Sequence, residues 1–248
     1  MAKKSADRDR RAKIAEMQRQ AKAAERRRTL LIIGTAVLVV AVIAGAVGFA
    51  ILRDPNRPPS GELASLGVAA SAASCDPVIN DKASGSSVHV GPGTSQPNVT
   101  KVKYSTVPPT SGEHYGAPEY PNREFYDEDD RPKMETLVHN LEHGYTILWF
   151  DNTATTEQKA TLRAVAKQAN SSTAARDKFI VSAWDPGYGA FPSGKHFAIS
   201  HWAADANDPG NQSKQQGHRQ LCGAISGDVV QKFITAYPRT LAPEANAQ

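Results

Sequence analysis

The sequence has few cysteines and lacks the common catalytic signatures. Only Cys75 and Cys222 occur among its 248 residues. It contains no G-x-S-x-G elbow, no P-loop and no G-x-G-x-x-G after a predicted strand, so it gives no support to serine-hydrolase, P-loop or dinucleotide chemistry. Met134 is the only methionine after the N-terminal region, which argues against a methionine-rich Cu(I) site.

Positive charge is concentrated at the N-terminus. Residues 1–28 hold eleven Lys/Arg against four Asp/Glu, a net charge of +7, while the whole chain is only +4. The remainder therefore has a net charge of −3 (4 − 7). We expect a basic cytoplasmic tail over residues 1–28 and no basic folded surface of the kind that binds nucleic acid.

A long apolar segment follows this tail. Residues 30–52 are 23 positions without a charge, which as a helix would span a hydrocarbon core of about 30 Å. The preceding arginines orient such a segment with its N-terminus inside. The sequence predicts a transmembrane signal anchor at 29–52, with the N-terminus cytoplasmic, the rest outside the plasma membrane and the membrane as an integral partner. A signal peptide cleaved near Ala44-Gly45-Ala46 is the alternative, and it would export the same domain.

The remaining residues predict a linker and one α+β domain. Residues 53–74 are rich in Pro, Ser, Gly and Ala and lack periodicity, which indicates a flexible linker. Within 75–248, we expect a small sheet with strands near 99–107, 145–150, 178–184 and 196–202. Two main helices, one after a capping box at Thr155–Gln158 and one with an apolar stripe from Val230 to Tyr237, are expected to cover one face of the sheet.

The two cysteines are expected to form a disulfide. Outside the cytoplasm an isolated pair of thiols usually oxidises. A Cys75–Cys222 bond would join the start of the predicted domain to the region of its last helix. Cys222 as a thiolate metal ligand is the alternative use.

Histidines at helical spacing provide the main candidate site. His139, Glu142 and His143 would project together from a helix over 134–143 and spell H-x-x-E-H, in which both histidines bind zinc. Gly144, however, predicts that the helix ends at the second histidine. A structural role for these residues, such as an interaction of His143 with the helix dipole, therefore stays open.

Two further histidines precede this helix. His114 lies in PPTSGEHYG, a turn-rich segment that can direct a side chain toward a site, and His89 lies in the short segment SSVHVGPG. Both are candidate metal ligands. Imidazole nitrogen suits copper and zinc, and we therefore expect one of these two metals.

Four segments resemble a known bacterial family. YSTVPPTSGEHY (104–115), ETLVHNLEHGYTILWF (135–150), FAISHWAAD (197–205) and FITAYPRTLAPE (233–244) are similar, in that order, to blocks of the membrane-anchored domain-of-unknown-function family numbered 3105. The resemblance implies an N-terminal anchor, one extracytoplasmic domain and shared histidines in these blocks. His201 departs from the pattern, which has a small hydroxyl residue there, and is expected to have a local structural role.

Three functions fit these features. The first is an extracytoplasmic domain that binds copper or zinc through His139, His143 and His114, with Glu142 or His89 completing the ligands. The second is a non-catalytic cell-envelope module that contacts a partner protein or a cell-wall polymer through exposed aromatic residues or the acidic loop at 123–131. The third is a metal-dependent hydrolase with Glu142 as general base.

Overall fold

The structure, a computed structural model, describes residues 62–120 and 123–247 and scattered helical residues between Lys13 and Gly45. The chain forms two compact units, Met1–Asp54 and Pro55–Gln248. Within the described residues, no helix is both long and apolar enough to cross a membrane. The predicted tail (1–28) and anchor (29–52) lie partly outside the described residues, as does the first part of the predicted linker (53–61).

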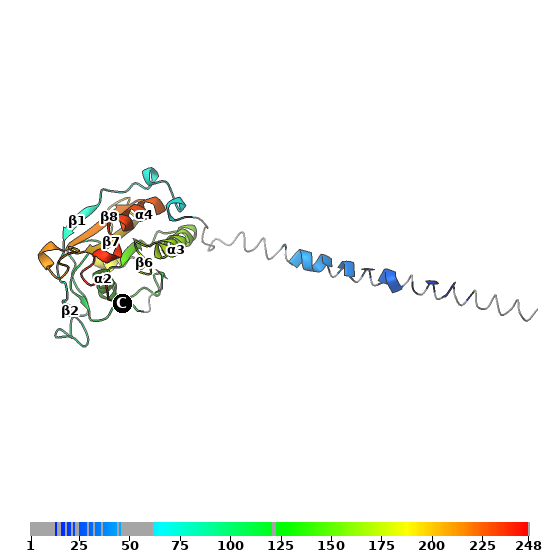
Figure 1. Cartoon of the computed structure of the whole chain (residues 1–248), viewed down its shortest axis with the longest axis horizontal. Helices are drawn as coiled ribbons and strands as arrows, with labels where there is room; N and C mark the ends of the chain where they lie inside the picture. The colour runs from blue at the N-terminus through cyan, green and yellow to red at the C-terminus, as the bar shows by residue number, and fades with distance from the viewer. Residues whose placement is uncertain are drawn as a thin grey trace, which may run out of the picture. The chain divides into compact units, whose positions relative to one another are not determined.

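A mixed six-stranded sheet forms the centre of the second unit (Figure 1). Its order is β1-β8-β7-β5-β6-β4, in which β5 pairs parallel with β6 and antiparallel with β7. The strands are β1 (Ile79–Lys82), β4 (Phe125–Tyr126), β5 (Thr146–Phe150), β6 (Phe179–Ala183), β7 (Phe197–Ala203) and β8 (Gln216–Cys222). Every residue of β5, β6 and β7 is buried, as expected for strands covered on both faces.

Helices cover both faces of this sheet. Helices α3 (Thr156–Ser171) and α4 (Gly227–Ala236) pack against Leu148 and Phe150 of β5. Helix α2 (Met134–Glu142) packs against Ile147 and Trp149, which point to the opposite face. The α+β class is confirmed, and the two predicted main helices, α3 and α4, do cover one face, while the apolar face of α2 covers the other. Short 3₁₀ helices are η1 (Leu63–Ser65), η2 (Ala70–Ala72), η3 (Pro186–Tyr188), η4 (Gln212–Lys214) and η5 (Arg239–Leu241).

The predicted capping box begins α3. Thr155 Oγ1 accepts a hydrogen bond from the backbone N–H of Gln158, and Gln158 Oε1 accepts one from the N–H of Thr155. These two contacts satisfy donors that the first turn of a helix leaves unpaired.

The strand predicted at 99–107 does not form. This segment has no strand assignment, and the backbone N–H of Val102 donates to Glu135 Oε1 of α2 at 2.8 Å. The N–H that would donate to a neighbouring strand in a sheet therefore donates to a side-chain carboxylate of the helix. The alternating pattern arises because the side chain of Val102 is buried, at 9% exposed. It does not correspond to pairing with a neighbouring strand.

The folded domain also begins before Cys75. Leu63 and Leu66 are buried in the same core as α3 and α4. The backbone N–H of Gly227, the first residue of α4, donates to Leu66 O at 2.8 Å. Residues 62–74 are therefore part of the domain, in place of the second half of the predicted linker.

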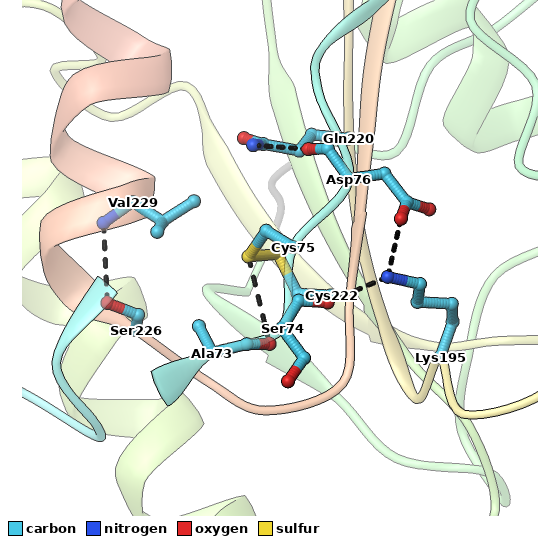
Figure 2. The surroundings of a disulfide bond; sticks show 9 residues. All are labelled: Ala73, Ser74, Cys75, Asp76, Lys195, Gln220, Cys222, Ser226 and Val229. Carbon is cyan, nitrogen blue, oxygen red and sulfur yellow. Dashed lines mark hydrogen bonds and ion pairs between the residues drawn. A yellow bond between two sulfur atoms is a disulfide. The ribbon is translucent and has the colours of Figure 1, made fainter. Parts of the chain in front are cut away.

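The predicted disulfide joins Cys75 to Cys222 (Figure 2). Backbone contacts flank it, since the N–H of Asp76 donates to Leu221 O and the N–H of Gly223 donates to Ala73 O, both at 2.9 Å. Lys195 lies 2.6 Å from the Asp76 carboxylate. The disulfide thus fixes the N-terminal segment to the end of β8.

Two buried histidines lie opposite each other on β7 and β8. His201 and His218 are register partners, and His218 stacks on the ring of Tyr237 at 3.8 Å. Burial, with a smaller contribution from His218, lowers the pKa of His201 to about 3. Burial lowers the pKa of His218 to about 4. Both rings are therefore neutral in the folded protein at pH 5, which agrees with a structural role for His201.

Removal of the disulfide should destabilise the domain. A bond that closes a loop of 147 residues restricts the unfolded chain and is worth at most about 4–5 kcal/mol. We expect the Cys75→Ala/Cys222→Ala double variant to unfold at a lower urea concentration, with an unchanged far-UV spectrum before the transition. Stoichiometric alkylation of the non-reduced wild-type protein would contradict the bond.

Acidification should also destabilise the metal-free protein. His201 and His218 take up protons near pH 6.5 when unfolded, whereas their folded pKa values are about 3 and 4. Above pH 6.5 both rings are neutral in the folded and the unfolded protein, so they do not lower its stability. As the pH falls toward the folded pKa values, the unfolded protein takes up protons first, and the free energy of unfolding decreases by about 2 kcal/mol per ring at pH 5. Urea unfolding at pH 7 and pH 5 measures this loss. An equal loss in wild type and His201→Gln would show that His201 does not contribute.

Candidate metal centre

Helix α2 presents one side of the candidate site. His139 and Glu142 lie one turn apart on it, and His143 is its C-cap residue. Gly144 follows with φ +89°, a conformation that glycine adopts at low cost and that ends a helix. Because the helix stops there, His143 is the last side chain that α2 can direct toward the site.

A small pair of strands presents the other side. Strands β2 (His89–Val90) and β3 (His114–Tyr115) pair in parallel, with His89 as the register partner of His114. The carbonyl of Tyr115 contacts the His139 ring. This pairing places His89 and His114 next to each other and beside α2.

Four of the five predicted ligand residues converge. One ligand atom from each of His89, His114, His139 and Glu142 lies within 4.8 Å of the corresponding atoms of the other three. His114 and Glu142 are fully buried and His139 is 5% exposed. This set, called the inner group below, could hold a metal ion.

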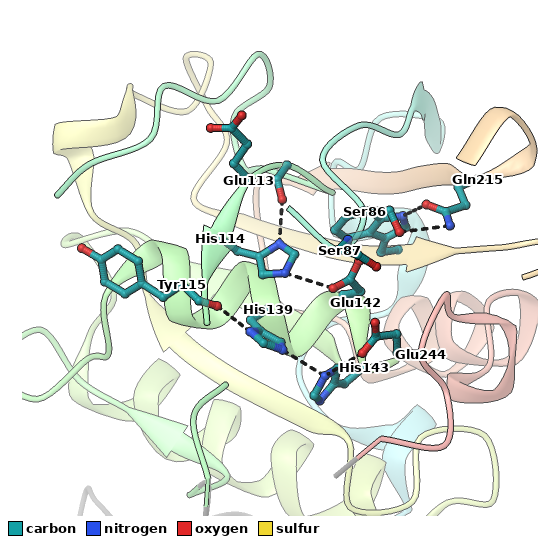
Figure 3. Close-up of polar contacts among 12 residues, drawn as sticks. Ser86, Ser87, Glu113, His114, Tyr115, His139, Glu142, His143, Gln215 and Glu244 are labelled. Carbon is teal, nitrogen blue, oxygen red and sulfur yellow. Dashed lines mark hydrogen bonds and ion pairs between the residues drawn. The ribbon is translucent and has the colours of Figure 1, made fainter. Parts of the chain in front are cut away.

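Backbone carbonyls fix two of its imidazole rings (Figure 3). His114 Nδ1 lies 2.7 Å from Gly112 O, and His139 Nδ1 lies 2.5 Å from Tyr115 O. Since a carbonyl oxygen only accepts, each Nδ1 carries a hydrogen, which leaves Nε2 as the nitrogen of each ring that can bind a metal. Metal-binding histidines are oriented in the same way, by donation from the other ring nitrogen.

Glu142 faces Nε2 of His114. Its Oε1 accepts a hydrogen bond from the Ser87 N–H at 2.7 Å, and its Oε2 lies 3.0 Å from His114 Nε2. Neither Glu142 Oε2, His114 Nε2 nor His89 Nε2 has an aligned hydrogen-bond partner among the described residues, and all three are buried. Buried polar atoms without partners are costly, and a cation among them would satisfy all three.

The charge states suit a cation. Burial lowers the pKa of His139 to about 4, and the nearby rings of His114, His143 and His89 lower it further against the opposing effect of the Tyr115 carbonyl. Burial alone would raise the pKa of Glu142, but hydrogen bonding and positive charge from the His114 ring in its protonated form, with hydrogen bonds from Ser87 and Ser86, outweigh burial and lower it. His139 is therefore neutral and Glu142 ionised at pH 7, the forms in which both bind metals.

His143 lies beside the inner group, next to His139. Its Nε2 is 3.0 Å from His139 Nε2 and 3.3 Å from Glu244 Oε2. The sequence predicted His143 as a ligand together with His139, whereas the structure pairs it with Glu244. His143 and Glu244 are called the outer pair below.

Glu244 was not predicted as part of the site, although it ends the block FITAYPRTLAPE, because it is not at a spacing typical of a metal ligand. The C-terminal segment brings it there. The backbone N–H of Glu244 donates to Glu142 O at 3.0 Å, and Lys178 Nζ donates to the carbonyls of His143, Ala245 and Ala247. The resemblance of its block to the family was a signal for this segment, but it did not indicate these contacts.

Comparisons with known proteins place the chain in a family. Neither a search of curated proteins nor a search of solved structures found a match. The family described as "Protein of unknown function (DUF3105)" matches residues 95–248, a range that holds His114, His139, Glu142 and the outer pair and that begins after His89. Because the match covers more than half of the chain, the protein belongs to this family.

Proposed function

We propose that the domain binds one transition-metal ion, copper or zinc, through His89, His114, His139 and Glu142. The observation that carries the proposal is the convergence of one ligand atom from each of these four residues within 4.8 Å. The contacts of His114 Nδ1 and His139 Nδ1 with carbonyls support it, because they leave Nε2 as the nitrogen of each ring that can bind a metal. Three imidazoles and one carboxylate are a donor set that zinc and copper accept.

The donor types argue for this class of metal. Calcium and magnesium prefer oxygen ligands, whereas three of the four donors here are nitrogen. Both cysteines of the chain are in the disulfide, so a thiolate-rich site is excluded. Imidazole and carboxylate together suit zinc or Cu(II).

We also propose that the domain works outside the cytoplasm, held in the plasma membrane by residues 29–52. The Cys75–Cys222 bond supports an oxidising compartment. The uncharged run at 30–52 after a tail of net charge +7 supports the orientation with the N-terminus inside. A partner protein in the cell envelope is compatible with this location.

The full-length protein, stripped with a chelator and equilibrated with Zn(II) or Cu(II), should retain one equivalent of metal after buffer exchange. His114→Ala and Glu142→Gln each remove one donor from the inner group. Each should weaken binding by at least about tenfold, in line with the loss caused even by residues that only support ligands. Bound metal measured by atomic absorption, together with competition against a chelator of known affinity, gives both quantities.

His196→Ala is the matched control. This histidine pairs with Asp151 at 2.8 Å and is not one of the inner group, so its loss should leave metal retention unchanged. The proposal is wrong if the wild type retains less than half an equivalent of either metal. It is also wrong if His114→Ala retains metal as tightly as the wild type.

A further inference from the structure

The outer pair has the spacing of two ligands of one ion. His143 Nε2 and Glu244 Oε2 lie 3.3 Å apart. A tetrahedral ion with bonds of about 2.0–2.1 Å separates its ligand atoms by about 3.3 Å. Nitrogen from a histidine and oxygen from a glutamate are also the donor types of the inner group.

Exposure increases from the inner group to the outer pair. His114 and Glu142 have no exposed side-chain surface, the side chain of His143 is 9% exposed, and that of Glu244 is 38% exposed. His139 connects the two sets, since it belongs to the inner group and its Nε2 lies 3.0 Å from His143 Nε2. A series of metal-binding atoms thus leads from solvent to the buried group.

The position of Glu244 is fixed by the fold. Its backbone N–H is bonded to the carbonyl of Glu142, itself in the inner group. The buried Lys178 ammonium donates to one carbonyl at the end of α2 and to two in the C-terminal segment. These contacts attach residues 244–247 to the end of α2 and hold the Glu244 carboxylate beside His143.

We propose that His143 and Glu244 form an outer binding position through which the transition-metal ion reaches the inner group. The inference rests on the proposed function and adds a route to it. An ion held by the outer pair reaches His139 Nε2 by exchanging one ligand at a time. In the empty site the hydrogen between the two rings belongs to His143 Nε2, because His139 keeps its own on Nδ1. When His143 binds the ion through Nε2, its ring carries that hydrogen on Nδ1.

Stopped-flow measurements with Zn(II) on the full-length protein test this route. Glu244→Gln keeps the backbone bond to Glu142 and removes the carboxylate. We expect Zn(II) uptake and Zn(II) release into excess chelator both to slow by about tenfold, because a residue on the path changes the barrier. The first equivalent of zinc should still bind at equilibrium. His143→Gln should slow both rates in the same way, and it provides a second test if Glu244→Gln does not fold.

Glu128→Gln is the control. This residue is exposed and follows β4, so the variant should load and release zinc at wild-type rates. Wild-type uptake and release in both Glu244→Gln and His143→Gln would overturn the outer position while leaving the inner site intact. Faster zinc release with unchanged zinc uptake in either variant would also overturn the outer position. That result would mean that the substituted residue is a ligand of the metal in its final site. A wild type that binds no zinc would instead overturn the proposed function, and this route with it.

Discussion

The hydrogen bonds from His114 Nδ1 and His139 Nδ1 to the carbonyls of Gly112 and Tyr115 determine how these two rings are oriented in the candidate site. They place a hydrogen on Nδ1 of each ring and leave Nε2 as the metal-binding nitrogen, which in His114 faces Glu142 and in His139 faces His143. Three buried atoms of the inner group, His89 Nε2, His114 Nε2 and Glu142 Oε2, have no aligned hydrogen-bond partner among the described residues. A cation is the partner that such a group lacks.

The fold serves to bring these carbonyls and rings together. Helix α2 lies on the sheet face formed by Ile147, Trp149 and their neighbours, which makes it a rigid support for His139 and Glu142. The short β2–β3 pair adds His89 and His114 from segments that precede the helix. The C-terminal segment places Glu244 next to this site as part of the outer pair. The candidate site therefore depends on contacts among four segments that are separate in the sequence.

The sequence predicted the elements whose pattern is local. Strands β5, β6 and β7 are short buried apolar runs, α3 has its capping box, and the disulfide uses the only two cysteines. Strand β8, with His218 and Arg219 among its seven residues, was missed because its polar side chains find partners on β1, such as Asp81 for Arg219. The His139–Glu142 pair was visible from helical spacing. The partners that orient the rings could not be predicted, because they are backbone carbonyls. Glu244 could not be predicted either, because it comes from a segment distant in the sequence.

The tautomers of His114 and His139 provide the most direct measurement. Long-range ¹H–¹⁵N correlation spectra of the histidine rings, recorded on metal-free protein and after addition of Zn(II), identify which nitrogen carries the hydrogen and which binds the ion. The account predicts Nδ1–H rings for both residues in the metal-free state and a zinc-dependent shift confined to Nε2. Nε2–H rings, or spectra that zinc leaves unchanged, would contradict it.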